Sequence, residues 1–152
     1  MRYIYDHSTL SDKELDVILN DVFPRVHYGV YCRMYMGKKE GTTEDFFTTH
    51  CFKDELDDLY CYWIHDGAIR PYLRPMDSMT DEEKKRYYDL RRGVHETGDV
   101  DLVVVLIEWL NKWGFDHHHL IDYGLAVPAE DWMYADPPEE RSLKKCYKAP
   151  ED

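Results

Sequence analysis

The sequence predicts an α+β fold: a small three-stranded antiparallel meander packed by an N-terminal helix and by a buried helix in the C-terminal half. Three observations lead to this prediction. Apolar residues recur at helical spacing near the N-terminus, three short runs in the first half read as strands, and residues 99–114 hold the densest apolar run. The chain has 152 residues, enough for one domain with a sizeable core.

The first predicted element is a helix over residues 12–23. Ser11 and Glu14 form a capping box, in which each side chain accepts a hydrogen bond from the backbone N–H of the other residue. The apolar residues follow the spacing of one helix face: Leu15, Ile18, Leu19, Val22 and Phe23. Pro24 is expected to end the helix, because proline has no backbone N–H and clashes with the preceding turn.

Three strands follow in the prediction. Residues 27–36 alternate at strand spacing, residues 46–52 form a second short run after a glycine-bounded turn, and residues 59–65 form a third. Short consecutive strands with tight connections favour an antiparallel meander with one packed face. The next segment, residues 69–80, contains Pro71 and Pro75 and is expected to be a stiff, extended connector.

The second half is predicted to be helical. Thr80 and Glu83 form a second capping box, which starts a surface helix that runs to about Arg92 and stops at Gly93.

The following helix is capped by Asp99 and ended by Gly114. Its polar residues occupy one narrow stripe, so we expect it to be buried on most sides. A strand over VVVLI is the alternative, because β-branched residues favour sheets, but the helical spacing continues to Trp113.

The domain is expected to span residues 1–127. Asp116 and Gly124 mark the ends of a last short helix, and residues 128–152, which include Pro137 and Pro138, form a partly irregular tail.

The composition restricts the class of function. There are 31 acidic residues against 19 basic ones, a net charge of −12, which disfavours direct binding to nucleic acid. The same charge suits a protein that mimics DNA. We see no hydrophobic leader and no apolar run long enough to span a membrane, so we expect no membrane association. The four cysteines then read as reduced thiols, and the expected location is the cytoplasm.

Two segments resemble a known set of sequences. Residues 70–85 (RPYLRPMDSMTDEEKK) match a PYLRPMSSMTEEEK-like pattern, and residues 107–134 match a pattern of the type WLN…FDYRGLI…GLA…MY. Together they resemble short hypothetical proteins of Bacteroidales gut bacteria, their phages and mobile elements. That set has no established activity, so the resemblance implies a setting, an accessory gene of a phage or mobile element. Where the set has Tyr-Arg-Gly, this chain has His117, His118 and His119.

Two groups of residues are candidate metal ligands. His118 and Asp122 share a face if their segment is helical, and His50, Cys61 and His65 come together if their two strands pair. A metal site needs three or four convergent ligands, and neither spacing is that of a zinc knuckle. Partly packed histidines and buried cysteines therefore remain the alternative explanation.

A further candidate is a basic and aromatic strip in the proline-rich connector, formed by Arg70, Tyr72, Arg74 and Met76. Arginine and tyrosine are frequent at binding hot spots, and a pre-extended segment loses little entropy when it docks. The alternative is that the strip packs across the sheet and its arginines pair with local acids.

We find no catalytic motif of a known type, so we assign no catalytic residues, predict no cofactor and do not expect an enzyme. The favoured hypothesis is a small accessory protein that acts by binding another protein. The alternatives are an acidic DNA mimic that inhibits a nucleic-acid-binding protein, and a metal-binding enzyme or regulator that uses the histidine and cysteine groups.

Overall fold

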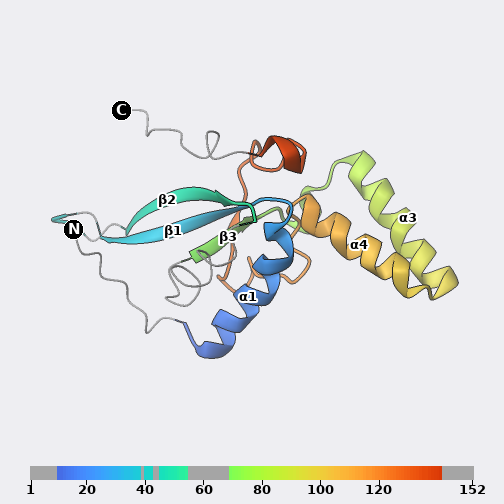
Figure 1. Ribbon diagram of the computed structural model, residues 1–152, viewed down its shortest axis with the longest axis horizontal. Coiled ribbons are helices and arrows are strands. Elements are labelled where there is room, and N and C mark those ends of the chain that lie inside the picture. The colour runs from blue at the N-terminus through green and yellow to red at the C-terminus, as the bar shows by residue number, and fades with distance from the viewer. Residues whose placement is uncertain (1–9, 39, 43–44, 55–68, 142–152) are drawn as a thin grey trace.

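The computed structural model describes residues 10–38, 40–42, 45–54 and 69–141, and it has an α+β architecture (Figure 1). The elements, in chain order, are α1 (Asp12–Val26), β1 (Val30–Lys38), β2 (Asp45–Phe52), β3 (Ile69–Leu73), η3 (Met76–Ser78), α3 (Asp81–Thr97), α4 (Val100–Lys112), β4 (Val127–Pro128) and η4 (Pro138–Glu140). The strand expected over residues 59–65 lies outside the described residues.

The described strands form one mixed sheet in the order β2-β1-β3-β4. The β1–β2 pair is antiparallel, as predicted, with Val30 opposite Phe52. The expected connector is wrong in its first part, because residues 69–73 form β3, antiparallel to β1 and parallel to β4. Pro71 lies opposite Cys32 of β1, and the ladder to β4 begins one residue later, at Tyr72.

Helix α1 covers one face of this sheet. Its buried residues join those of β1, β2, β3 and the segment after α4 in one core: Ile18, Val22, Val26, Val30, Cys32, Met34, Phe52, Ile69, Leu73, Leu120, Leu125 and Ala126. The Ser11–Glu14 capping box is present, but Pro24 does not end the helix. The last turn forms because Arg25 pairs with Asp21 one turn earlier, with Nε 3.0 Å from Oδ1, and both side chains are buried.

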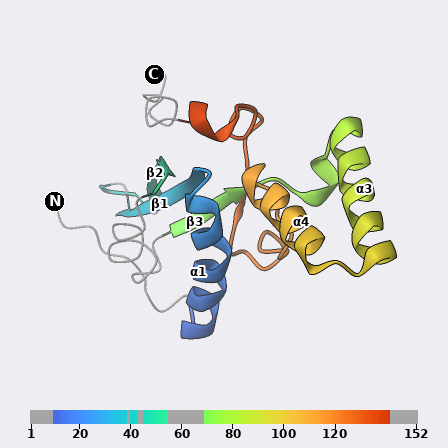
Figure 2. The same ribbon diagram turned by 45° about the vertical axis from the view of Figure 1, so that its right-hand side comes forward.

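Helices α3 and α4 form a hairpin that projects from the sheet (Figures 1 and 2). The Thr80–Glu83 capping box starts α3 as expected, but the helix continues through Gly93 to a left-handed cap at Gly98. Gly93 serves packing instead, since a Cβ there would lie 3.4 Å from Leu102 of α4. Asp99 caps α4 through a bond from the N–H of Asp101.

The expectation that α4 is buried on most sides is wrong. Among its residues only Leu110 and Asn111, at the end nearest the sheet, are buried. The hairpin stands away from the sheet, so α3 is the main neighbour that α4 has in the described structure (Figure 2). The sequence of an apolar helix shows which residues can be buried. The position of the other elements decides which of them are buried.

The segment after α4 differs from the prediction in two ways. Residues 116–124 form consecutive turns rather than a helix, although Asp116 does accept bonds from the N–H groups of Leu120 and Ile121. Residues 128–141 pack on the sheet, with Tyr134 and Arg141 buried, so the compact unit extends past the expected boundary at residue 127.

Candidate functional site

Helix α4 carries an exposed apolar stripe. Val100, Val104 and Ile107, here called the α4 stripe, are 72%, 48% and 42% exposed. Their spacing places them on one side of the helix. The acidic residues Asp101 and Glu108 are exposed beside them.

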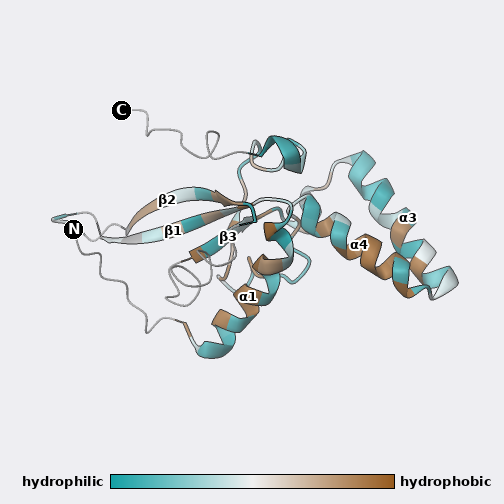
Figure 3. Cartoon of the chain, in the orientation of Figure 1, coloured by the Kyte–Doolittle hydropathy of each residue, from teal (hydrophilic) through white to brown (hydrophobic). Residues whose placement is uncertain are grey.

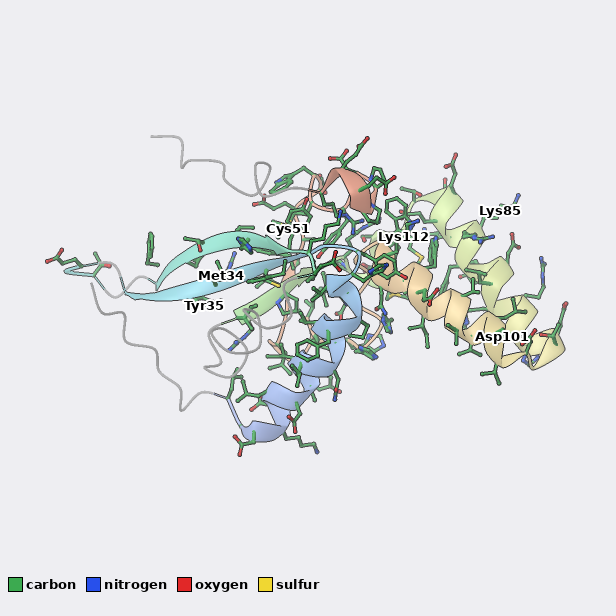
Figure 4. The ribbon with its side chains drawn as sticks, in the orientation of Figure 1. Met34, Tyr35, Cys51, Lys85, Asp101 and Lys112 are labelled. Carbon is green, nitrogen blue, oxygen red and sulfur yellow. The ribbon has the colours of Figure 1, made fainter. Side chains whose placement is uncertain are left out.

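The α4 stripe points away from α3. The opposite side of α4 carries Leu102, which lies against Gly93, and Leu106 and Trp109, which pack in the cluster that contains Met79 of α3's entry segment. The hairpin is coloured largely hydrophobic along α4 (Figure 3), and Asp101 lies at the end of α4 far from the sheet (Figure 4). The hairpin therefore presents one packed side and one exposed apolar side.

A second feature is a buried ion pair that holds a histidine. Asp21 Oδ2 lies 2.8 Å from His118 Nδ1, and Arg25 donates to both oxygens of the same carboxylate. Burial alone raises the pKa of Asp21, but the bonds from His118 and Arg25 and the arginine charge outweigh it, and the pKa lies below its usual value. Arg25 also donates to the carbonyl oxygen of Phe115, which ties α1 to the segment after α4.

The neighbouring histidine is held in its neutral form. Nε2 of His117 lies 2.8 Å from Oδ1 of Asn111, and the side chain is partly buried. Burial, and then the positive charge of Arg25, lower its pKa from 6.5 to about 4. His117 is therefore uncharged at neutral pH.

The predicted metal ligands do not converge in the described structure. His118 has Asp21 as its carboxylate partner, and Asp122 is an exposed residue of a turn, because the segment is not a helix. His50 packs edge-to-face with Phe52 of its own strand, with ring centroids 4.4 Å apart. Cys61 and His65 lie outside the described residues. Within the described ranges, no group of three or more His, Cys, Asp or Glu residues could hold a metal ion.

The predicted basic and aromatic strip does not form one surface. Tyr72 is only 4% exposed, and its hydroxyl accepts from Nε of Arg33 at 3.0 Å. Arg70 lies over the ring of Tyr35, 5.9 Å from its centroid. The placement of these side chains agrees with the packing alternative.

The other half of the strip packs too. Arg74 forms two hydrogen bonds with Glu83, of 2.8 and 2.7 Å, and its guanidinium lies 4.2 Å from the centroid of the Phe115 ring. Met76 packs beside the cluster of Met79, Leu110 and Phe115.

The structure also contains a cleft that the sequence reasoning missed. It has a volume of about 560 Å³ and lies where the segment before α3, the end of α4 and residues 129–135 meet. Its lining includes Trp109 of α4 and Trp113, the residue directly after the helix. The i, i+4 spacing of the two tryptophans is visible in the sequence. Glu130 and Asp131, which also line the cleft, belong to the segment that we expected to be irregular.

No family model, curated protein or solved structure matches this chain. No helix among the described residues combines the length and apolarity that a membrane span requires. Any functional assignment therefore has to be argued from the surfaces above.

Proposed function

We propose that this chain is a small accessory protein that acts by binding another protein, and that the α4 stripe is its contact surface. The exposure of Val100, Val104 and Ile107 on one helix side carries the proposal. Exposed apolar side chains gathered on one face are typical of interaction sites. Burying each of them against a partner would contribute about 1 kcal/mol, since they are already partly shielded.

The surroundings of the stripe favour a basic amphipathic segment as the partner's contact. Asp101 and Glu108 border the stripe, and the chain has a net charge of −12. A helix that offers an apolar face with lysine or arginine beside it would bury the valines and place its charges near these acids. The sequence resemblance to proteins of phages and mobile elements supports an accessory role of this kind.

Neighbouring valines of α4 provide a matched test. Val104 is 48% exposed within the stripe, whereas Val105 is 41% exposed and lies about 100° away around the helix. The tagged wild-type protein, Val104→Glu and Val105→Glu are each expressed at low level in the cells that encode the chain, purified, and compared by mass spectrometry of the proteins they retain. Both substitutions add the same charge, so they differ in the surface they alter.

We expect one stoichiometric partner with wild type and Val105→Glu, and its loss with Val104→Glu, while circular dichroism shows all three proteins folded. The retained partner should contain a basic amphipathic helix. No partner for the wild type, or equal retention by the two variants, would overturn the proposal.

The other two hypotheses have less support. A DNA mimic needs a surface of ordered acids, whereas α3 interleaves acidic and basic residues along its length. A metal-dependent function would need ligands beyond the groups that the described residues bring together.

A further inference from the structure

We propose that the cleft beside α4 is a second binding site, which takes an extended peptide segment through a lysine or arginine side chain. This inference does not depend on the α4 stripe. The site, here called the tryptophan cleft, is lined by Arg74, Pro75, Ser78, Thr80, Glu83, Trp109, Trp113, Ala129, Glu130, Asp131, Tyr134 and Ala135.

The size and walls of the cleft suit a peptide. Its volume of about 560 Å³ falls within the range of small-ligand sites in proteins. Pro75, Trp109, Trp113 and the ring of Tyr134 make most of the wall apolar. Tyr134 is fixed, because its hydroxyl donates to the carbonyl oxygen of Tyr72 and accepts from the N–H of Tyr31. The wall that Tyr134 forms is therefore anchored to β1 and β3.

The charges in the cleft favour a cation. Three carboxylates line it, those of Glu83, Glu130 and Asp131, against one guanidinium, that of Arg74. Arg74 is already neutralised by its two bonds to Glu83, so Glu130 and Asp131 are two further carboxylates at the cleft that this arginine does not pair with. Negative charge beside apolar walls attracts basic side chains and repels acidic ones.

The indole rings add a specific attraction. The face of tryptophan is the strongest aromatic partner of lysine and arginine. The chain already uses Trp113 in this way, with Lys112 Nζ and Arg141 Cζ 5.6 and 5.7 Å from its ring centroid, so an incoming cation has to share this ring with them. An incoming aliphatic stem would lie along the apolar wall, with its charged end near Asp131.

The test uses three five-residue peptides with blocked ends, in which alternate alanines are replaced by arginine, by glutamine or by glutamate. Each is titrated into the ¹⁵N-labelled full-length protein, and the indole N–H signals are followed by NMR after assignment with Trp109→Phe and Trp113→Phe. We expect saturable shifts of the Trp109 and Trp113 signals with the arginine peptide alone, weakened by added salt.

A matched pair of variants identifies the acids. Glu130→Gln combined with Asp131→Asn should weaken arginine-peptide binding about fivefold or more. Glu139→Gln combined with Glu140→Gln removes the same charge from the exposed η4 turn outside the cleft and should leave the affinity unchanged. The indole N–H of Trp132 donates to Glu130 at 2.5 Å, so a substitution of Glu130 also changes that contact. Asp131→Asn alone is therefore the cleaner single variant.

The inference is overturned if the arginine and glutamine peptides shift the indole signals equally, if neither does so in a saturable manner, or if both double variants behave alike. Val104→Glu separates this proposal from the function proposed above, because it should abolish partner capture and leave peptide binding at the cleft intact.

Discussion

Gly114 is the position where the structure predicts the largest effect of a single added methyl group. Its φ of +77° lies in the left-handed region, where an alanine is strained by roughly 1–2 kcal/mol. A Cβ at this position would also lie 2.5 Å from Cδ2 and 2.6 Å from Cγ of Tyr134. These atoms belong to the base of a buried ring that two hydrogen bonds hold in place, so the ring cannot move aside cheaply.

The overlap should cost a further 1–3 kcal/mol, roughly the usual range for overpacking a buried site. We therefore expect Gly114→Ala to lower the free energy of unfolding by about 2–5 kcal/mol. Gly98 and Gly124 provide the controls. Their φ values are +63° and +72°, but a Cβ at either position meets nothing within 4 Å, so alanine there should cost only the backbone strain.

Urea unfolding followed by circular dichroism at 222 nm measures the three variants against wild type under identical conditions. The informative quantity is the difference between Gly114→Ala and the two controls, because it isolates the contact with Tyr134 from the strain. A loss for Gly114→Ala no larger than that for Gly98→Ala would refute the reasoning and show that the ring yields.

Three further predictions concern buried polar groups. The folded pKa of His117, about 4, lies below its usual 6.5, so the unfolded chain takes up the proton first and stability should fall as the pH drops from 6.5 towards 4. Urea titrations at pH 7 and 5 should show a loss of about 1–2 kcal/mol, discounted for partial exposure, that His117→Gln removes. The pKa of Asp21 is also lowered, so its contribution is present above its usual pKa of 3.8 and is lost as the pH falls below it. Asp21→Asn should destabilise by about 3–5 kcal/mol at pH 7, measured in urea, because Arg25 stays buried without its partner. Arg141→Met should cost about 3 kcal/mol in the same assay, since it leaves unpaired the carbonyl oxygens of Tyr28, Gly29 and Lys112 that Arg141 now contacts.

The local signals of the sequence were sufficient to locate the starts of α1, α3 and α4. Both capping boxes and the Asp99 cap are confirmed, because each depends on hydrogen bonds within four residues. The helix ends were placed wrongly at Pro24 and Gly93. In both cases a side-chain contact outweighed the local preference, the buried Asp21–Arg25 pair in one and the approach of Leu102 in the other.

Segments that contain proline were harder to predict. Pro71 and Pro128 both lie in strands, although the prediction placed Pro71 in an extended connector and residue 128 at the start of the tail. A proline is compatible with a sheet when its missing N–H faces no partner, and that condition depends on which strand lies beside it. The single-sequence pattern contains no information on the neighbour, so β3 and β4 could not be found that way.

The candidate site shows the same limit. Residue types suggested the strip of Arg70, Tyr72, Arg74 and Met76, but these side chains serve packing to a large extent. The tryptophan cleft combines residues from distant segments of the chain. The α4 stripe is exposed because no other described element covers that side of the helix. Sequence periodicity predicts which residues share a face of a helix, and it cannot say whether another element covers that face.

Unlike the buried clusters, the α4 stripe is not explained by the packing of the core. Among the described residues, Val100, Val104 and Ile107 belong to none of the buried clusters, so polar residues at these positions would cost the core little. An acidic surface is explained by solubility alone, whereas exposed valines and an isoleucine oppose solubility. Neither folding nor solubility thus accounts for the stripe, which is why the functional proposal is based on it and not on the net charge.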